Sequence, residues 1–465
     1  MMDSTDAATG TVRQRLANRL HEIRYEDLPA ETVAATKRLM LDSLGCLAGG
    51  FHSAPAKAAR GAVDRLGGAA LATLVGTDRK TSPSLAALAN GTALRYLDFN
   101  ASYNGRDPSK VSGLLPAVLA VAEAEGRSGR DLIAAWVAGA ELQCRLSDYA
   151  GNPSMKDLGW HHTCNLQFGA VVGAARLLTD DPRLTAEAIA ISATHMNTLA
   201  QIQHGRISMI KATADGWAAK GGVEAAYLAV NGLTGPDEIF EGKAGWTGRV
   251  AGAVDYDGLL GPIAGRFRIG GARIKAFAVV GPGQTVVQAA VDLRADKRLD
   301  LDKIERIVIS LPERVVSDPA VDDEKKKFPK NRETADHSFH YIVAIALIEG
   351  ECGEAQYAPE KIASSKVRAL IEKTSLAADA EFSAKKTGGG GVKIALSDGT
   401  ILEKRYLAPP GHPSNPLSDA QLARKYGRQM EEVFPQARIE AIRAAIFDME
   451  NVKKVSEFTR LLASA

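Results

Sequence analysis

Cysteine is scarce in this chain, and its placement excludes two classes of protein. The 465 residues include four cysteines that lie far apart and form no C-x-x-C pair, namely Cys46, Cys144, Cys164 and Cys352. This spacing fits neither a disulfide-stabilised scaffold nor a structural zinc site. We therefore expect reduced thiols and no metal centre.

A dominant charge is also missing. Lys and Arg total 57 against 55 Asp and Glu, which gives a formal net charge of +2. This balance does not favour nucleic acid or a membrane surface as a partner. No apolar run approaches the length of a membrane span, and residues 1–10 are acidic, small and polar, unlike a basic and apolar export signal. We expect a cytoplasmic protein whose partner is a small molecule.

Helical patterning is what the chain has in abundance. Its length and its composition, 45% hydrophobic and 24% charged, suit a globular protein of about two domains. From Thr11 to about Gly232, apolar residues recur at spacings of three and four in Ala- and Leu-rich segments, among them 31–48, 115–125, 132–148 and 216–230. Such spacing predicts an all-helical first domain.

The pattern changes after about Gly265. Residues 304–311 and 392–396 are short β-prone runs, and helical spacing returns from Asp419 to Ala465. The prediction is a mainly α fold with an all-helical domain over 1–265 and a smaller α+β domain over 266–405. Residues 406–465 are expected to return to the helical domain.

Four consecutive glycines, 388–391, could in principle cradle a phosphate. They come just before a predicted strand and not before a helix, and that strand runs into a turn at 397–400. A flexible approach to a β-hairpin is therefore favoured over a phosphate-binding loop.

The run 90–100 reads N-G-T-A-L-R-Y-L-D-F-N, which is too polar for a plain core helix and indicates the wall of an active site. It resembles the N-G-T-A-x-R-x-L-D-F-N signature of the MmgE/PrpD family. Further blocks similar to that family lie at 41–46, 233–236, 240–243, 335–338 and 413–418, so the resemblance covers nearly the whole chain. It implies a discontinuous helical domain with the α+β domain inserted as a lid, a homodimer, and an activity among 2-methylcitrate dehydratases, cis-aconitate decarboxylases and an iminodisuccinate epimerase.

Two positions depart from what the family resemblance implies. Lys110 stands where family enzymes carry an active-site histidine, and Pro282 fills a second histidine position. A solvated loop lysine is the alternative interpretation of Lys110. Because the ordinary pKa of lysine is about 10.4, Lys110 would need burial or a cationic neighbour such as Arg106 to act as a base near neutral pH.

The resemblance also implies a set of substrate-contacting side chains. Within G-W-H-H-T, either His161 or His162 is expected to face the substrate, and the other to pack or cap a helix. Lys211 is expected to hold a carboxylate with help from Arg206. The remaining expected binding residues are Asp98, Ser102, Lys275, Gln284 and Tyr341. For Gln284 a purely structural role at a helix start is equally open.

The two lost histidines favour a cofactor-independent epimerase of an iminodisuccinate-like acid. Epimerisation needs one group that removes the proton beside a carboxylate and a second that returns it from the opposite face. Lys110 and Tyr149 are expected to fill these roles, with His162 as a further proton-transfer group; an ordinary half-buried tyrosine is the alternative interpretation of Tyr149. The alternatives are a dehydratase or decarboxylase of the 2-methylcitrate or cis-aconitate type, and an inactive carboxylate-binding protein.

Overall fold

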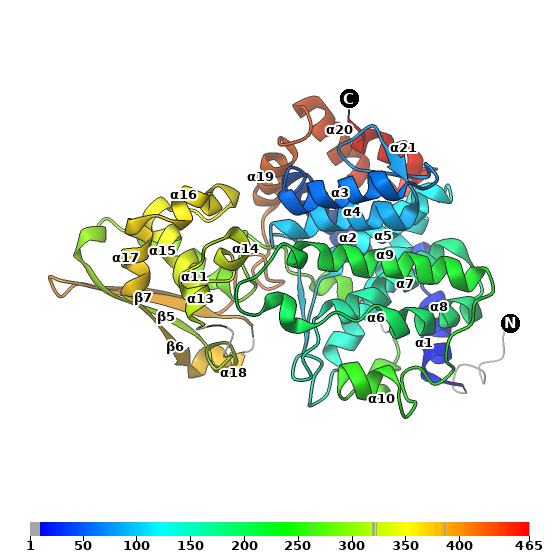
Figure 1. Cartoon of the computed structure of the whole chain (residues 1–465), viewed down its shortest axis with the longest axis horizontal. Helices are drawn as coiled ribbons and strands as arrows, with labels where there is room; N and C mark the ends of the chain where they lie inside the picture. The colour runs from blue at the N-terminus through cyan, green and yellow to red at the C-terminus, as the bar shows by residue number, and fades with distance from the viewer. Residues whose placement is uncertain (1–9, 264, 319–320, 322, 386, 465) are drawn as a thin grey trace.

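The computed structural model describes residues 10–464 except 264, 319, 320, 322 and 386. Figure 1 shows two bodies side by side, a large helical one and a smaller one that contains a sheet. The mainly α fold with a smaller α+β part is confirmed, with 57% of residues in helices and 10% in strands. Among the described residues, no helix combines the length and apolar character needed to cross a membrane.

The larger body is built from helices that precede the sheet in the chain. Its helices are α1 (Val12–His21), α2 (Ala30–Gly49), α3 (Ala54–Leu66), α4 (Pro83–Tyr96), α5 (Leu115–Ala124), α6 (Gly129–Asp148), α7 (Thr163–Leu178), α8 (Pro182–His195), α9 (Ile210–Val230) and α10 (Tyr256–Leu259). Short strands β1 (Ala72–Thr73) and β2 (Lys80–Thr81) pair with each other, as do β3 (Tyr103–Asn104) and β4 (Pro108–Ser109). Helix α9 packs against both α4 and α7 in this body.

The central helices carry apolar residues almost all round, so they are buried on most faces. In α5 and α7 nearly every residue is buried. The outer helix α3, by contrast, buries one stripe and begins at Ser53, whose hydroxyl accepts a hydrogen bond from the Ala56 N–H as an N-cap.

The smaller body is a four-stranded sheet covered by helices on one side (Figure 1). Its strands are β5 (Ile304–Pro312), β6 (Thr374–Asp379), β7 (Gly390–Leu396) and β8 (Ile401–Tyr406), in the order β6-β5-β7-β8. Its helices are α11 (Gly283–Arg294), α12 (Glu313–Val316), α13 (Glu324–Lys327), α14 (Arg332–Ala335), α15 (Phe339–Glu349), α16 (Pro359–Ile362), α17 (Ser365–Glu372) and α18 (Ala380–Lys385). Strands β5 and β6 run parallel, and the other two pairs are antiparallel.

The glycine run belongs to this sheet. Gly390 and Gly391 are the first residues of β7, which forms an antiparallel hairpin with β8. Gly388 has a φ of 84°, a backbone conformation that favours glycine. The hairpin interpretation of 388–391 is therefore confirmed.

The last helices return to the larger body, where they appear in orange and red in Figure 1. These are α19 (Asp419–Met430), α20 (Gln436–Phe447) and α21 (Val455–Thr459). Helix α19 packs on α2, and α21 packs on α5. Apolar residues of this segment, such as Leu422 and Ile442, share one core with α2 and α6. The boundaries at 265 and 405 stay predictions.

Candidate functional site

Two glycines allow α4 and α9 to approach closely. A Cβ on Gly91 would lie 2.7 Å from the Gly216 Cα, and one on Gly216 would lie 2.5 Å from the Leu88 carbonyl oxygen. No larger residue fits this crossing without moving a helix backbone. The crossing brings Arg95, one turn beyond Gly91, close to the part of α9 that carries Lys211 and Asp215.

Helix α4 ends in a strained turn that places Asp98. Asp98 has a φ of 49° and is the non-glycine residue in the described chain with a positive φ. Aspartate tolerates this left-handed conformation better than most residues, and such strain is often found at functional sites. The Asp98 N–H donates to the Arg95 carbonyl (3.1 Å), and the Arg95 guanidinium donates to Asp98 Oδ1 (2.5 Å).

Two lysines complete the surroundings of the Asp98 carboxylate. Lys275 Nζ lies 3.1 Å and Lys110 Nζ 3.4 Å from Asp98 Oδ1. Burial raises the pKa of the Asp98 carboxyl, but the charges of Arg95, Lys275 and Lys110 outweigh burial and hold it well below its usual range. Burial lowers the pKa of both lysines, and Asp98 partly offsets this. Asp98 is therefore a carboxylate in contact with three cations.

Lys110 is thus not a solvated loop residue. Its side chain is 9% exposed, and it lies at the start of the η2 turn (Val111–Leu114). The cations near it are Arg95 and Lys275, whereas Arg106 is exposed.

A second ion-pair group joins the two bodies next to the first. Lys211 Nζ on α9 lies 2.7 and 2.8 Å from the Asp336 oxygens, and Arg332 donates to Asp336 Oδ2 at 2.8 Å. His337 Nδ1 contacts Asp336, and His337 Nε2 lies 3.8 Å from Asp98 Oδ2. Burial and the neighbouring Lys211 lower the pKa of His337 to about 4, so this imidazole is neutral at neutral pH.

Sequence reasoning missed Asp336 and His337 as site residues. They belong to the A-D-H-S block that was noted for its family resemblance, so a signal was present. Arg332 also donates to the carbonyl oxygens of Tyr96 (3.1 Å) and Leu97 (3.1 Å), which ties the smaller body to the end of α4.

His161 and His162 lie together beside this cluster. Their rings are 3.8 Å apart and both residues are buried, with Nε2 atoms that have no hydrogen-bond partner among the described residues. His161 Nδ1 lies 3.0 Å from Thr163 Oγ1. Burial lowers the pKa of both rings well below the usual value, and nearby cationic charge lowers it further. Two neutral imidazoles with free nitrogens are suited to proton transfer or hydrogen bonding.

Three of these groups could in principle hold a metal ion. Asp98, Asp336 and His337 offer ligand atoms within 4.8 Å of one another. Their oxygens, however, already contact Lys275, Lys211 and Arg332. A divalent cation would lie among ammonium and guanidinium groups, so this donor set fits an ion-pair network better than a metal centre.

Other expected site residues are held in different surroundings. The Tyr149 hydroxyl accepts a hydrogen bond from Arg268 (3.0 Å), in a network with Asp148. The Tyr341 hydroxyl donates to the Gln356 carbonyl within the core of the smaller body. Arg206 is exposed.

Gln284 and Ser102 have contacts that favour structural roles. The Gln284 side chain accepts from the N–H groups of Ala276 and Phe277 and donates to the Phe277 carbonyl, so it holds the loop before α11. This is the helix-start interpretation. Ser102 is buried and exchanges backbone hydrogen bonds with Arg273.

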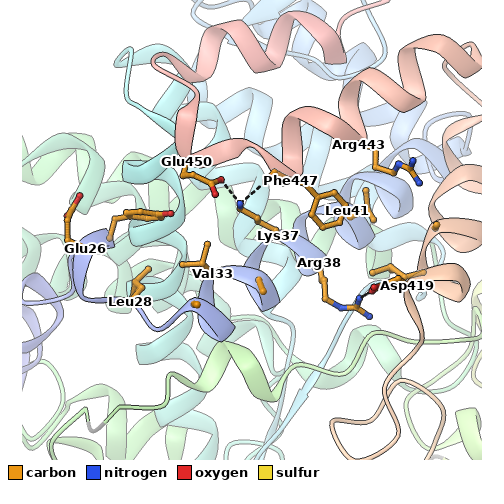
Figure 2. A pocket seen from close by; sticks show the side chains of 15 residues that line it. Glu26, Leu28, Val33, Lys37, Arg38, Leu41, Asp419, Arg443, Phe447 and Glu450 are labelled. Atoms are coloured by element: carbon orange, nitrogen blue, oxygen red, sulfur yellow. Dashed lines mark hydrogen bonds and ion pairs between the residues drawn. The ribbon is translucent and has the colours of Figure 1, made fainter.

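A cavity of about 990 Å³ lies elsewhere, between α2 and the last helices (Figure 2). Lys37 extends between these elements and is bound there by Glu450 and the Phe447 carbonyl. None of the residues that line this cavity belongs to the charged cluster. The cluster itself is closely packed around its ion pairs.

Two family comparisons cover most of the chain. Residues 14–258 match the MmgE/PrpD N-terminal domain, and residues 277–449 match the MmgE/PrpD C-terminal domain. The chain belongs to the MmgE/PrpD family. The resemblance found in the run 90–100 is therefore confirmed.

Relatives in this family align over nearly the full length. A cis-aconitate decarboxylase-like protein of Aspergillus oryzae is 26% identical over 99% of this chain and 99% of its own. The cis-aconitate decarboxylase of Homo sapiens is 25% identical over 97% of this chain and 94% of its own. The mitochondrial 2-methylcitrate dehydratase of Yarrowia lipolytica is 26% identical over 96% of this chain and 88% of its own.

The prediction of an isomerase of the iminodisuccinate type is wrong by this comparison, because the named MmgE/PrpD relatives are decarboxylases and dehydratases. Structure gives a physical reason. The epimerase prediction needed Tyr149 beside Lys110, but Tyr149 is bound to Arg268, whereas Lys110 is bound to Asp98. The loss of two histidines is compatible with lyase chemistry because Lys110 is buried and two other histidines lie nearby.

Proposed function

We propose that this protein is a carboxylic acid lyase that decarboxylates a small polycarboxylate similar to cis-aconitate. The observation that carries this proposal is the buried group of Arg95, Lys110, Lys275 and Lys211, which surrounds two carboxylates of low pKa, Asp98 and Asp336, and one further acid, Asp215, whose pKa burial raises. An excess of buried cations favours a polyanionic ligand. The names of the relatives from Aspergillus oryzae and Homo sapiens support the same reaction class.

Decarboxylation needs a place for negative charge and a proton. When the bond between the CH2 carbon of the substrate and its carboxylate breaks, carbon dioxide leaves and the electron pair forms a new double bond to the next carbon. The old double bond gives its electrons to the carbon at its far end, and fixed cations stabilise the negative charge as it develops there. That carbon then takes a proton from an acid, for which Lys110 is suited because burial lowers the pKa of its ammonium group.

Lys211 and Lys275 are proposed to hold the carboxylates of the substrate that do not react. Both are buried and already neutralise carboxylates of the protein. A substrate carboxylate could replace part of those contacts when the two bodies separate to admit it. His161 and His162, which are neutral, would donate or accept hydrogen bonds at the reacting carbon.

Dehydration of a 2-methylcitrate-like acid is the second candidate, supported by the name of the relative from Yarrowia lipolytica. This reaction needs a base for the proton and an acid for the leaving hydroxyl. A neutral His161 or His162 could be the base and Lys110 the acid. The weakness of this candidate is Pro282, which has no proton to exchange at a position where the family resemblance implies a histidine.

The test is to follow the purified protein by proton NMR with cis-aconitate, and separately with 2-methylcitrate, in buffer made with heavy water. Decarboxylation predicts loss of carbon dioxide and one deuterium in the product, itaconate. Formation of methylaconitate with no decarboxylation would favour the second candidate. No turnover of either acid would contradict the proposal for these substrates.

Matched lysine variants make the test specific. Lys110→Met is expected to abolish turnover because it removes the proton donor while it keeps an unbranched side chain. Lys361→Met is the control, since Lys361 pairs with Glu349 on the smaller body and has no contact with the cluster. Equal turnover by both variants would exclude Lys110 from the chemistry.

A further inference from the structure

Asp215 is a buried acid that the proposed chemistry leaves without a role. It lies on α9 one turn after Lys211, next to the glycine crossing with α4. Its exposed fraction is 0%, and neither carboxyl oxygen accepts a hydrogen bond of ordinary geometry from the described residues. A carboxylate so placed is costly unless a charge or a proton compensates it.

Two contacts connect Asp215 to the Lys110 region. Arg95 Nε lies 3.5 Å from Asp215 Oδ1, while the same guanidinium binds Asp98 through its other nitrogen. A Cβ on Gly113 would lie 3.1 Å from Asp215 Oδ2, so the turn that follows Lys110 rests directly on the carboxyl group. The Gly113 N–H donates to the Lys110 carbonyl (3.1 Å).

The charged and titratable groups that face Lys110 come from five elements. They are Asp98 and Arg95 at the end of α4, Asp215 on α9, Lys275 before α11, the neutral pair His161 and His162 before α7, and the Cys46 thiol on α2. Two of these groups are cations, and Asp98 is shared with both of them. Asp98 therefore cannot neutralise Lys110 by itself.

We infer that Asp215 is a positioning residue that keeps Lys110 in its charged, proton-donating form, by placing a second carboxyl group behind the turn on which Lys110 stands. This inference rests on the proposed function for its catalytic meaning.

The pKa shifts of Asp215 and Lys110 have the directions that this role requires. Burial raises the pKa of Asp215, and the charges of Arg95 and Lys110 partly offset this. Burial lowers the pKa of Lys110, whereas Asp98 and Asp215 both raise it. Asp215 and Lys110 therefore titrate as a coupled pair, in which each group favours the charged form of the other.

The first experiment is an NMR titration of Lys110 in protein labelled with ¹³Cε-lysine, with the signal assigned by its loss in Lys110→Met. In Asp215→Asn, which keeps the shape and removes the charge, the midpoint is expected to move to lower pH by about one unit, a tenfold change in proton affinity. Glu123→Gln is the matched control, because Glu123 is a buried acid bound to Thr73 and Lys80, away from the site. An unchanged midpoint in folded Asp215→Asn would overturn the inference.

The reciprocal experiment does not depend on the single variant Asp215→Asn. Because the interaction is mutual, Lys110→Met must raise the pKa of the Asp215 carboxyl. The infrared band of the protonated acid, identified by its absence in Lys110→Met/Asp215→Asn, should persist to higher pH in Lys110→Met than in the wild type. An identical band in both proteins would contradict the inference, even where Asp215→Asn failed to fold.

Turnover of the acid that the wild type consumes supplies the catalytic test. In Asp215→Asn the alkaline limb of the kcat profile should move to lower pH with the NMR midpoint, whereas a packing role would lower kcat equally at all pH values. A wild type without turnover would refute the proposed function and leave the NMR result to decide the inference. A shifted NMR midpoint with an unmoved limb would refute the role in catalysis.

Discussion

Replacing Lys425 by methionine should destabilise the protein and disturb the backbone that positions Asp98 and Lys275. Lys425 lies on α19, and its Nζ lies 2.5 Å from Asp42 Oδ1 on α2. It also donates to the carbonyl oxygens of Phe99 (2.8 Å) and Lys275 (2.9 Å), and it lies 3.7 Å from the centre of the Phe99 ring. One side chain thus holds the chain just after Asp98 and the backbone of Lys275 together.

The expected loss is large because Asp42 is 1% exposed. Removing one partner of a buried ion pair costs about 3–5 kcal/mol, since the other charge is left uncompensated. Asp42→Asn alone should cost less than this, because the Lys425 ammonium group keeps the Phe99 and Lys275 carbonyl oxygens as partners. The double variant should recover part of the loss of Lys425→Met, which gives a positive coupling of about 1–3 kcal/mol in a double-mutant cycle.

The pH dependence has a definite sign. Burial raises the pKa of Asp42, and Lys425 opposes this shift, so Lys425→Met must raise the folded-state pKa further. A folded pKa above the unfolded one means that the folded state binds more protons, so stability is lost as pH rises. The deficit of Lys425→Met should therefore be larger at pH 8 than at pH 5.

Urea unfolding at both pH values, followed by circular dichroism and by tryptophan fluorescence, measures this deficit. Turnover should fall together with stability, because the Asp98 turn and Lys275 lose their shared support. A deficit below about 1 kcal/mol, the range of exposed ion pairs, would refute the reasoning. A deficit that shrank as pH rose would refute it as well.

Three further outcomes are expected. Gly216→Ala should lower the free energy of unfolding, measured in urea, by about 1–3 kcal/mol because the helix crossing has no room for the added methyl group. Gly61→Ala on α3 is the control, since its Cβ meets no atom within 4 Å and the change should be neutral or stabilising; equal effects of the two variants would refute the close crossing. Asp98→Asn should keep the turn but leave Arg95, Lys110 and Lys275 without their shared anion, so turnover should be lost and the melting temperature should fall below that of the wild type. This difference in melting temperature should shrink as rising pH neutralises the lysines, and a difference that stayed constant with pH would contradict the reasoning. His337 has a folded pKa of about 4 against an ordinary 6.5, so the unfolded state binds more protons and His337 reduces stability as pH falls through this window. The melting temperature of His337→Gln should therefore fall less steeply with decreasing pH in this window than that of the wild type.

Much of the architecture could be predicted from local pattern. The strand predicted at 304–311 is β5 (Ile304–Pro312), and the helix predicted at 132–148 is α6 (Gly129–Asp148). These elements have the apolar spacing of their type, and a capping box at Ser128 marks the start of α6. The buried face of a single helix or strand can therefore be predicted from sequence.

Pairing between distant residues was not readable. Lys110 could be singled out by its alignment, but its burial against Asp98 follows from the left-handed turn after α4. Tyr149 and Tyr341 have suitable chemistry, yet each hydroxyl is bound elsewhere, by Arg268 and by the Gln356 carbonyl. Homodimer formation, cytoplasmic location and the absence of a cofactor stay predictions.

The sequence by itself determined the mainly α fold, the smaller sheet-containing part, the family and the presence of several basic residues suited to a polyanion. Only the tertiary structure decided which charges meet: Asp98 with Arg95, Lys110 and Lys275, and Asp336 with Lys211. The physical reason is distance. Local pattern depends on neighbours within a few residues, whereas a buried charge is stabilised by partners that folding brings from far along the chain, as for Asp98 and Lys275, which are 177 positions apart.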